Sequence, residues 1–385
     1  MPEVYHALGL HFHQPHGNMN FLLSTNREEA LRILQCYIRP IRYLSECEGL
    51  AAVHLSISGT LLEQMCTLTL DELGSLKDAL ECYVNLSNVE FLATGFYHPV
   101  FPLIPESDWK SHVLRWVRKA ERLGLKFNGF WPPELGFTMK MIPLLSELGF
   151  KYVVVDGRYI EGGGEDRGFK PHLAEHSGAE ITVIPRDEEL SDAQMGGVTP
   201  RGFINMVKAK TSRFKGALLV TTWSDGENSR WFREVDESKN FWGYFFKPYV
   251  KLTEQDCGVT MTSISEFLKE HPPEDYVRVK TGAWKTFSND GETFSQWIGH
   301  EAQREAMKEV WDASAKLRRL KALIGCADGE AGRLIALAEE HLLRAETSCN
   351  FFWEAKWLPK VYRDLNVFNA LLRKAAEKAG LPFNP

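Results

Sequence analysis

The first 270 residues alternate short apolar runs with longer stretches of helical periodicity. Most of the short runs are apolar throughout, which is typical of strands buried on both faces of a parallel sheet. We expect strands at residues 4–12, 51–58, 89–97, 127–131, 152–156, 181–185, 217–223 and 259–262, and helices at 27–46, 70–86, 108–123, 138–148, 199–214 and 239–254. Repeated strand–helix units predict an α/β protein whose functional residues lie at the carboxyl ends of parallel strands.

The pattern changes after His271, where Pro272 and Pro273 interrupt it. A loop-like stretch rich in Thr, Gly, Trp and Asn follows, and three amphipathic helices rich in Ala and Leu are expected after it. We therefore expect two parts, an α/β body over residues 1–275 and a helical domain over residues 276–385.

Composition excludes several classes of protein. The 385 residues are 44% hydrophobic and 25% charged, with a net charge of −6, which argues against nucleic acid as the partner. No apolar run reaches the ~18 residues that a membrane span needs. The seven cysteines form no CxxC pair, and the N-terminus does not resemble a signal peptide. We expect a cytoplasmic protein with reduced thiols; the sequence does not indicate its oligomeric state.

Aromatic residues make up 12% of the chain, including 11 Trp, and several of these Trp lie in polar, loop-like stretches. Aromatic rings in such places suit ligands that have flat apolar faces and polar rims. Sugars are the commonest ligands of this kind, so the composition favours a carbohydrate partner.

Two carboxylates follow predicted strands at turn-like positions. Glu134 comes directly after Trp131-Pro132-Pro133, and Asp225 opens the turn that follows the strand at 217–223. A barrel presents catalytic acids in this way, at the carboxyl ends of its strands. A pair of carboxylates indicates cleavage or transfer of a glycosidic bond.

Five segments of the chain together carry a family resemblance. They are HQP at 13–15, GFYHP at 95–99, WPPE at 131–134, DGE at 225–227 and AETSCNFFWEAKW at 345–357. In this order they resemble glycoside hydrolase family 57. The resemblance implies an incomplete (β/α)7 barrel followed by a C-terminal helical bundle that completes the active-site cleft. It also implies a retaining mechanism on α-linked glycans, most often α-1,4-glucans.

By the same resemblance, Glu134 matches the nucleophile and Asp225 the general acid/base. Retention requires the two carboxyl groups to lie about 5–5.5 Å apart, so the fourth and seventh strands are expected to face each other. Asp225 must begin protonated, which needs partial burial or a like charge from Glu134 or Glu227.

The remaining segments are expected to form the sugar-binding wall. His98 stands where the family often has a carboxylate, and an imidazole can donate a hydrogen bond where Glu only accepts one. Trp131 and Trp223 are expected to offer apolar platforms beside the two carboxylates. The full set of expected binding residues is His11, His13, Gln14, Tyr97, His98, Trp131, Trp223, Trp284, Trp353 and Trp357.

Three alternatives remain open. One is an exo-acting α-glycosidase of the same family, including an α-galactosidase. Another is a glycan-binding protein that has lost turnover. The third is a metal-dependent polysaccharide deacetylase, because His11 and His13 have ligand-like spacing. The sequence lacks the strand-borne Asp pair and the HxxxH-type partner that such an enzyme uses, so we expect no metal and no cofactor.

Overall fold

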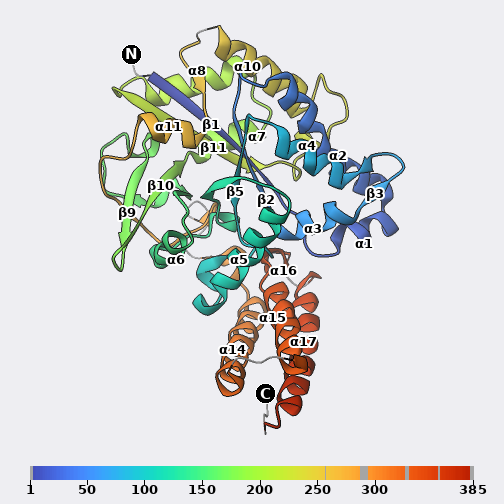
Figure 1. Cartoon of the computed structure of the whole chain (residues 1–385). Helices are drawn as coiled ribbons and strands as arrows, with labels where there is room; N and C mark the ends of the chain where they lie inside the picture. Colours follow the sequence, from blue (N-terminus) through green and yellow to red (C-terminus); the bar gives the residue numbers. More distant parts are fainter. Residues whose placement is uncertain (1–2, 256, 287–293, 326–328, 354–355, 382–385) are drawn as a thin grey trace.

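Seven parallel strands close into a barrel (Figure 1). The computed structural model describes residues 3–255, 257–286, 294–325, 329–353 and 356–381. Neighbours around the barrel pair in register, and β11 pairs with both β10 and β1, which closes the ring. The barrel strands are β1 (Glu3–Phe12), β2 (Val53–Ile57), β5 (Val89–Ala93), β6 (Phe127–Phe130), β7 (Tyr152–Asp156), β10 (Ala179–Arg186) and β11 (Ala217–Asp225). The expected (β/α)7 barrel is confirmed.

Helices surround this barrel on its outer face (Figure 1). They are α1 (Asn18–Thr25), α2 (Arg27–Glu46), α3 (Gly59–Thr67), α4 (Leu76–Asn85), α5 (Glu106–Arg122), α6 (Ile142–Glu147), α7 (Glu188–Met195), α8 (Pro200–Thr211), α9 (Arg230–Arg233), α10 (Lys247–Glu254) and α11 (Ile264–Glu270). Short additional strands are β3 (Thr69–Leu70), β4 (Gly74–Ser75), β8 (Ile160–Glu161), β9 (His172–His176), β12 (Thr260–Met261) and β13 (Arg278–Val279). The run expected as an eighth strand is β12, which pairs with β1 outside the ring.

Several expected elements have different boundaries, and three of them show why. The strand expected at 89–97 stops at Ala93, and the chain then turns through His98, whose φ is 60°. The helix expected from residue 70 begins at Leu76, because Gly74 turns the chain and Ser75 caps the helix by accepting from the Asp78 amide. The helix expected at 239–254 begins with a π-helical turn, Phe241–Phe246, before α10.

The barrel interior has its own apolar cluster, made mostly of residues on or directly after the strands and joined by two residues of α11. Trp131 and Trp223 are both fully buried in it and stack with ring centroids 6.3 Å apart. Gly9 on β1 makes room for Trp223, since a Cβ there would lie 2.1 Å from the indole ring. Burial of each large apolar side chain contributes about 1.5–3 kcal/mol, so these rings stabilise the barrel.

The C-terminal part is helical and has a second apolar cluster. Its helices are α13 (Ser295–Ile298), α14 (Glu301–Ile324), α15 (Gly329–Ala345), α16 (Ser348–Phe352) and α17 (Leu358–Lys378). Figure 1 shows α14, α15 and α17 side by side, with α16 and α5 where this bundle meets the barrel. The start of α16 touches the barrel loop after β5, because Ser348 N donates to His98 O at 3.0 Å.

Candidate active site

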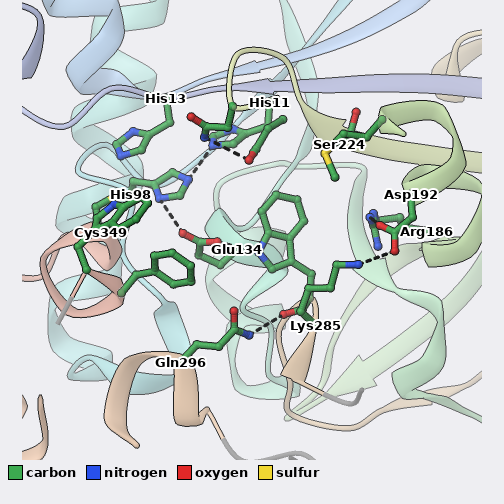
Figure 2. Close-up of a pocket in the computed structure, with 16 residues that line it drawn as sticks. His11, His13, His98, Glu134, Arg186, Asp192, Ser224, Lys285, Gln296 and Cys349 are labelled. Carbon is green, nitrogen blue, oxygen red and sulfur yellow. Dashed lines mark hydrogen bonds and ion pairs between the residues drawn. The ribbon is translucent and has the colours of Figure 1, made fainter. Parts of the chain in front are cut away.

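A pocket opens at the carboxyl ends of the barrel strands and is walled on one side by the C-terminal part (Figure 2). Of the expected site residues, seven line it: His11, His13, His98, Glu134, Asp225, Trp284 and Trp353. Both candidate catalytic carboxyl groups therefore share one pocket. The other lining residues are Arg186, Asp192, Met195, Ser224, Asn228, Lys285, Gln296, Cys349 and Phe352.

Glu134 lies in a tight turn just after β6. Pro132 and Pro133 restrict the approach, and Glu134 itself has φ 58° and ψ 15°, a conformation that non-glycine residues rarely adopt. Two donors hold its carboxylate. Ser348 Oγ donates to Oε1 at 2.8 Å, and Trp284 Nε1 donates to Oε2 at 2.7 Å. Both donors come from the C-terminal part of the chain.

Burial dominates the electrostatics of Glu134 and raises its pKa to about 7. The negative charge of Asp225 adds to this rise, while the hydrogen bonds from Ser348 and Trp284 oppose it by favouring the ionised form. The carboxyl group therefore changes charge near neutral pH, as catalytic acids and bases often do.

Asp225 is the last residue of β11 and lies opposite His11 in the register with β1. Burial raises the pKa of its carboxyl group. Asn228 Nδ2 donates to Asp225 Oδ2 at 3.2 Å, and this bond and the positive charge of Arg186 oppose the rise. Asp225 is thus a partly buried acid with fewer hydrogen-bond donors than Glu134 among the described residues.

Three imidazoles form a stack along one wall of the pocket. The ring of His98 lies 3.9 Å from that of His13 and 4.7 Å from that of His11, at interplanar angles of 9° and 20°. His11 in turn stacks on Trp131 at 4.2 Å. Burial lowers the pKa of all three histidines, so they are neutral at physiological pH.

Arg186 and Lys285 bring positive charge to another side of the pocket. Arg186 is 3% exposed, donates from Nε to Trp223 O at 2.8 Å, and lies over the Trp284 ring at 5.7 Å. Lys285 Nζ forms an ion pair with Asp192 Oδ2 at 2.5 Å. This side of the pocket is therefore polar, whereas Phe352 and Trp353 form an aromatic edge with exposed fractions of 42% and 53%.

Five of the expected sugar-binding residues do not line the pocket. Gln14 is buried and donates to Tyr37 Oη, and Tyr97 is buried where it accepts from Arg115. Trp131 and Trp223 belong to the barrel core, so the expectation that they form open platforms is wrong. Trp357 packs under Lys360, whose Nζ lies 3.0 Å from the indole centroid. Apolar periodicity predicts burial but does not distinguish a core ring from a ligand platform.

Several pocket residues were not expected as ligands. Arg186 follows the strand ITVIP, and its position at a strand end was a usable signal. Ser348 lies within the late segment at 345–357. Asp192, Lys285 and Gln296 had no sequence signal, because α7, the loop after β13 and α13 become part of the site only through folding.

Glu227, expected as one source of a like charge beside Asp225, is completely buried beside the site. Its Oε1 accepts from His13 N at 3.0 Å, and its own carbonyl oxygen accepts from Arg233 Nε. Burial and the negative charge of Asp225 raise its pKa well above the usual range. Glu227 thus ties the DGE turn to β1, as an element of the site's scaffold.

Within the described ranges, no group of three or more His, Cys, Asp or Glu side chains is arranged to hold a metal ion. None of the described helices is long and apolar enough to cross a membrane.

The fold and the paired carboxyl groups define an α/β barrel with a two-carboxyl pocket at its strand ends. A family model described as glycosyl hydrolase family 57 matches residues 7–280, and the chain belongs to this family.

Two curated relatives share similar sequence over half of the chain. An alpha-amylase of Pyrococcus abyssi and a 4-alpha-glucanotransferase of Thermococcus litoralis are each 31% identical over 192 residues, covering 49% of this chain and 28% of the relative. The match therefore spans less than a third of the length of these relatives.

Solved structures share the fold over nearly the whole chain. A family 57 branching enzyme of Thermococcus kodakaraensis superposes with a TM-score of 0.78 at 14% identity, covering 100% of this chain and 92% of that one. A branching enzyme of the same type from Pyrococcus horikoshii has a TM-score of 0.76 at 16% identity, covering 99% and 95%.

Proposed function

We propose that this protein is a retaining glycoside hydrolase or transglycosylase that acts on α-linked glycans, with α-1,4-glucan as the first candidate. The observation that carries the proposal is that Glu134 and Asp225 line one pocket at the strand ends. Membership of family 57 and the alpha-amylase and 4-alpha-glucanotransferase relatives support it.

The hydrogen bonds around the two carboxyl groups support a division of roles. Glu134 accepts from two donors, Ser348 and Trp284, and both stabilise the carboxylate that a nucleophile needs. Asp225 accepts only from Asn228 among the described residues. We therefore place the negative charge on Glu134 and the proton on Asp225 in the reactive state.

The reaction then has two steps. Asp225 donates its proton to the departing glycosidic oxygen while a Glu134 oxygen forms a bond with the anomeric carbon. Asp225, now ionised, next removes a proton from a water molecule or a sugar hydroxyl, which attacks the same carbon and releases Glu134. Two successive inversions give net retention, and the identity of the second attacker decides between hydrolysis and transfer.

We also propose that the barrel, residues 1–275, and the helical domain, residues 276–385, share this single cleft. Trp284, Lys285, Gln296, Cys349, Phe352 and Trp353 all line the pocket and all follow residue 276. A cytoplasmic location is part of the proposal, and the six described cysteines, all free thiols, support it.

A substrate screen with a nucleophile variant tests the proposed activity. We expect the wild-type protein to cleave or elongate maltooligosaccharides, amylose or aryl α-glucosides, with the product retaining the α-configuration by NMR. Glu134→Gln should abolish turnover and preserve sugar binding. Full turnover by Glu134→Gln would refute the nucleophile assignment, and an inverted product would refute retention.

The same screen separates the alternatives. Preferred cleavage of aryl α-galactosides would indicate the exo-acting α-galactosidase. Sugar binding by the wild-type protein with no turnover would indicate a binding protein. Loss of activity on chelation, or release of acetate from an acetylated glycan, would indicate a metal-dependent deacetylase; we expect a chelator to leave activity unchanged.

A further inference from the structure

Three hydrogen bonds link the stacked histidines to Glu134. His11 Nε2 and His98 Nε2 are 2.8 Å apart, His98 Nδ1 and Ser348 Oγ are 2.8 Å apart, and Ser348 Oγ donates to Glu134 Oε1 at 2.8 Å. Figure 2 shows His98 between His11 and Glu134, and its Nδ1 also lies 3.5 Å from Glu134 Oε1. The chain of contacts joins β1, the loop after β5 and the start of α16.

Counting protons determines the direction of each bond when Glu134 is ionised. Ser348 has one hydroxyl proton and uses it to donate a hydrogen bond to Glu134. Its oxygen must therefore accept a hydrogen bond from His98 Nδ1–H. A neutral imidazole has only one N–H, and the other nitrogen of His98 therefore accepts from His11 Nε2–H. Every donor in the chain then points toward the carboxylate.

With these hydrogen bonds made, His98 has no ring nitrogen left to hydrogen-bond a sugar. Both ring nitrogens are engaged, and the ring face lies against His13 at 3.9 Å. In contrast, His11 Nδ1 and His13 Nε2 have no hydrogen-bond partner within the part of the chain that the structure describes. Among the described residues, the stack thus contains two histidines with one unpaired ring nitrogen and one histidine whose ring nitrogens are both paired.

We propose that His98 is a positioning residue that orients the Ser348 hydroxyl toward Glu134, and that it does not read a sugar hydroxyl itself. This inference rests on the proposed function, in which Glu134 is the nucleophile. By holding Ser348 as a donor, His98 favours the ionised nucleophile in a buried pocket where burial opposes it.

Other groups also act on the charge of Glu134 and must be held constant in a test. The titratable side chains that line the pocket with it are His11, His13, Arg186, Asp192, Asp225, Lys285 and Cys349. Asp225 disfavours the negative charge of Glu134, whereas Trp284 donates to it. Of these, His11 contacts His98 and Cys349 contacts Ser348, whereas Arg186, Asp192, Asp225 and Lys285, all within the described ranges, are not hydrogen-bonded to either position.

The test compares Ser348→Ala, His98→Phe and the double variant by the pH dependence of kcat/KM. We expect Ser348→Ala to move the acidic limb to higher pH and lower kcat/KM about tenfold below that limb, because a charge-assisted hydrogen bond is lost. His98→Phe should move the limb in the same direction. The double variant should match Ser348→Ala, since His98 acts through Ser348.

Two further variants serve as rescue and control. His98→Asn keeps an N–H near the position of Nδ1 and tolerates positive φ, so we expect it to restore most of the activity that His98→Phe loses. Ser111→Ala removes a hydroxyl that donates to Glu339 Oε1 at 2.8 Å, outside the pocket but at the same junction. It should leave the pH profile unchanged.

Sugar binding gives an independent readout. In the Glu134→Gln background, adding His98→Phe should leave the Kd for the substrate identified in the screen within twofold. A larger loss of binding would show that His98 contacts sugar and would overturn the proposal. Multiplicative losses in the double variant, or an unchanged acidic limb in Ser348→Ala, would overturn it as well.

Failure of the proposed function gives a different pattern. In that case the wild-type protein turns over no α-glycoside, or Glu134→Gln remains active. If His98→Phe does not fold, Ser348→Ala and His98→Asn decide the outcome. His98→Asn with wild-type kcat/KM and Ser348→Ala with a shifted limb support the proposal, and the reverse pattern refutes it.

Discussion

Two histidine–carboxyl contacts lie where the barrel meets the helical part. Their histidines are close together in the sequence, and so are the residues that the helical part contributes to them. In the first, His98 hydrogen-bonds Ser348, which donates to Glu134, and His98 Nδ1 itself lies 3.5 Å from Glu134 Oε1. In the second, His112 on α5 contacts Glu346 directly, with Nε2 and Oε2 2.6 Å apart. Ser348 and Glu346 are two residues apart in sequence, so one short segment supplies a partner to each contact.

Burial raises the pKa of Glu134 and of Glu346 alike, and it lowers the pKa of both histidines. The contacts differ in access. The Glu346 and His112 side chains are 0% exposed, whereas the Glu134 side chain is 14% exposed and lines the pocket. A shifted pKa therefore identifies a buried acid, and only the adjoining cavity makes that acid a candidate for chemistry.

The largest expected effect is on kcat/KM, for a substitution in the pocket. Asp225→Ala should lower kcat/KM about 10²–10⁴-fold on substrates with poor leaving groups, because general acid catalysis is lost. An α-glycosyl fluoride, whose leaving group needs less protonation, should lose much less. Steady-state kinetics on both substrates measure the difference. Equal losses on the two substrates would contradict the role of Asp225 as the acid.

The second prediction concerns a variant that removes the buried contact between His112 and Glu346. Glu346→Ala should lower the free energy of unfolding by about 1–3 kcal/mol, because it leaves the fully buried His112 without the partner of its ring nitrogen. Activity per folded molecule should fall far less than in Asp225→Ala. Denaturant unfolding and kinetics at a temperature where the variant is folded test this. A variant of wild-type stability would contradict the assigned role.

The pH dependence of stability sharpens the contrast. The pKa of Glu346 is raised above its ordinary 4.5, so folding favours its protonated form, and this stabilisation is present at low pH and lost as pH rises toward the raised value. Because Gln does not titrate, Glu346→Gln does not lose stability in this way as pH rises. Its stability deficit relative to the wild type should narrow from pH 4.5 upward by about 1.4 kcal/mol per pH unit. A constant deficit between pH 5 and 7 would disprove this.

The smallest effect concerns the second donor to Glu134. The pKa of Glu134, raised to about 7, predicts that kcat/KM falls as pH drops through about 7, since the nucleophile gains a proton. Trp284→Phe removes the N–H that favours the ionised form, so the acidic limb should move upward by about one pH unit. A downward shift would contradict the hydrogen bond's role.

Much of the fold could be predicted because the barrel strands carry local signals. Apolar runs bounded by turn residues located all seven barrel strands, and the change after His271 located the helical part. The boundaries failed where capping or backbone turns decide them, as at Ser75 and at His98. The short helix α3 was missed because its nine residues hold too few turns to show a period.

The sequence by itself determined the strand–helix repeat and the positions of Glu134 and Asp225 after strands, because periodicity and turn residues act locally along the chain. Only the tertiary structure decided the rest of the site. Ser348 and Trp284 meet Glu134 across separations of 214 and 150 residues, and Trp131 and Trp223 turn into the core. These outcomes depend on which faces the closed barrel and the helical part bring together, and local sequence patterns carry no information about that.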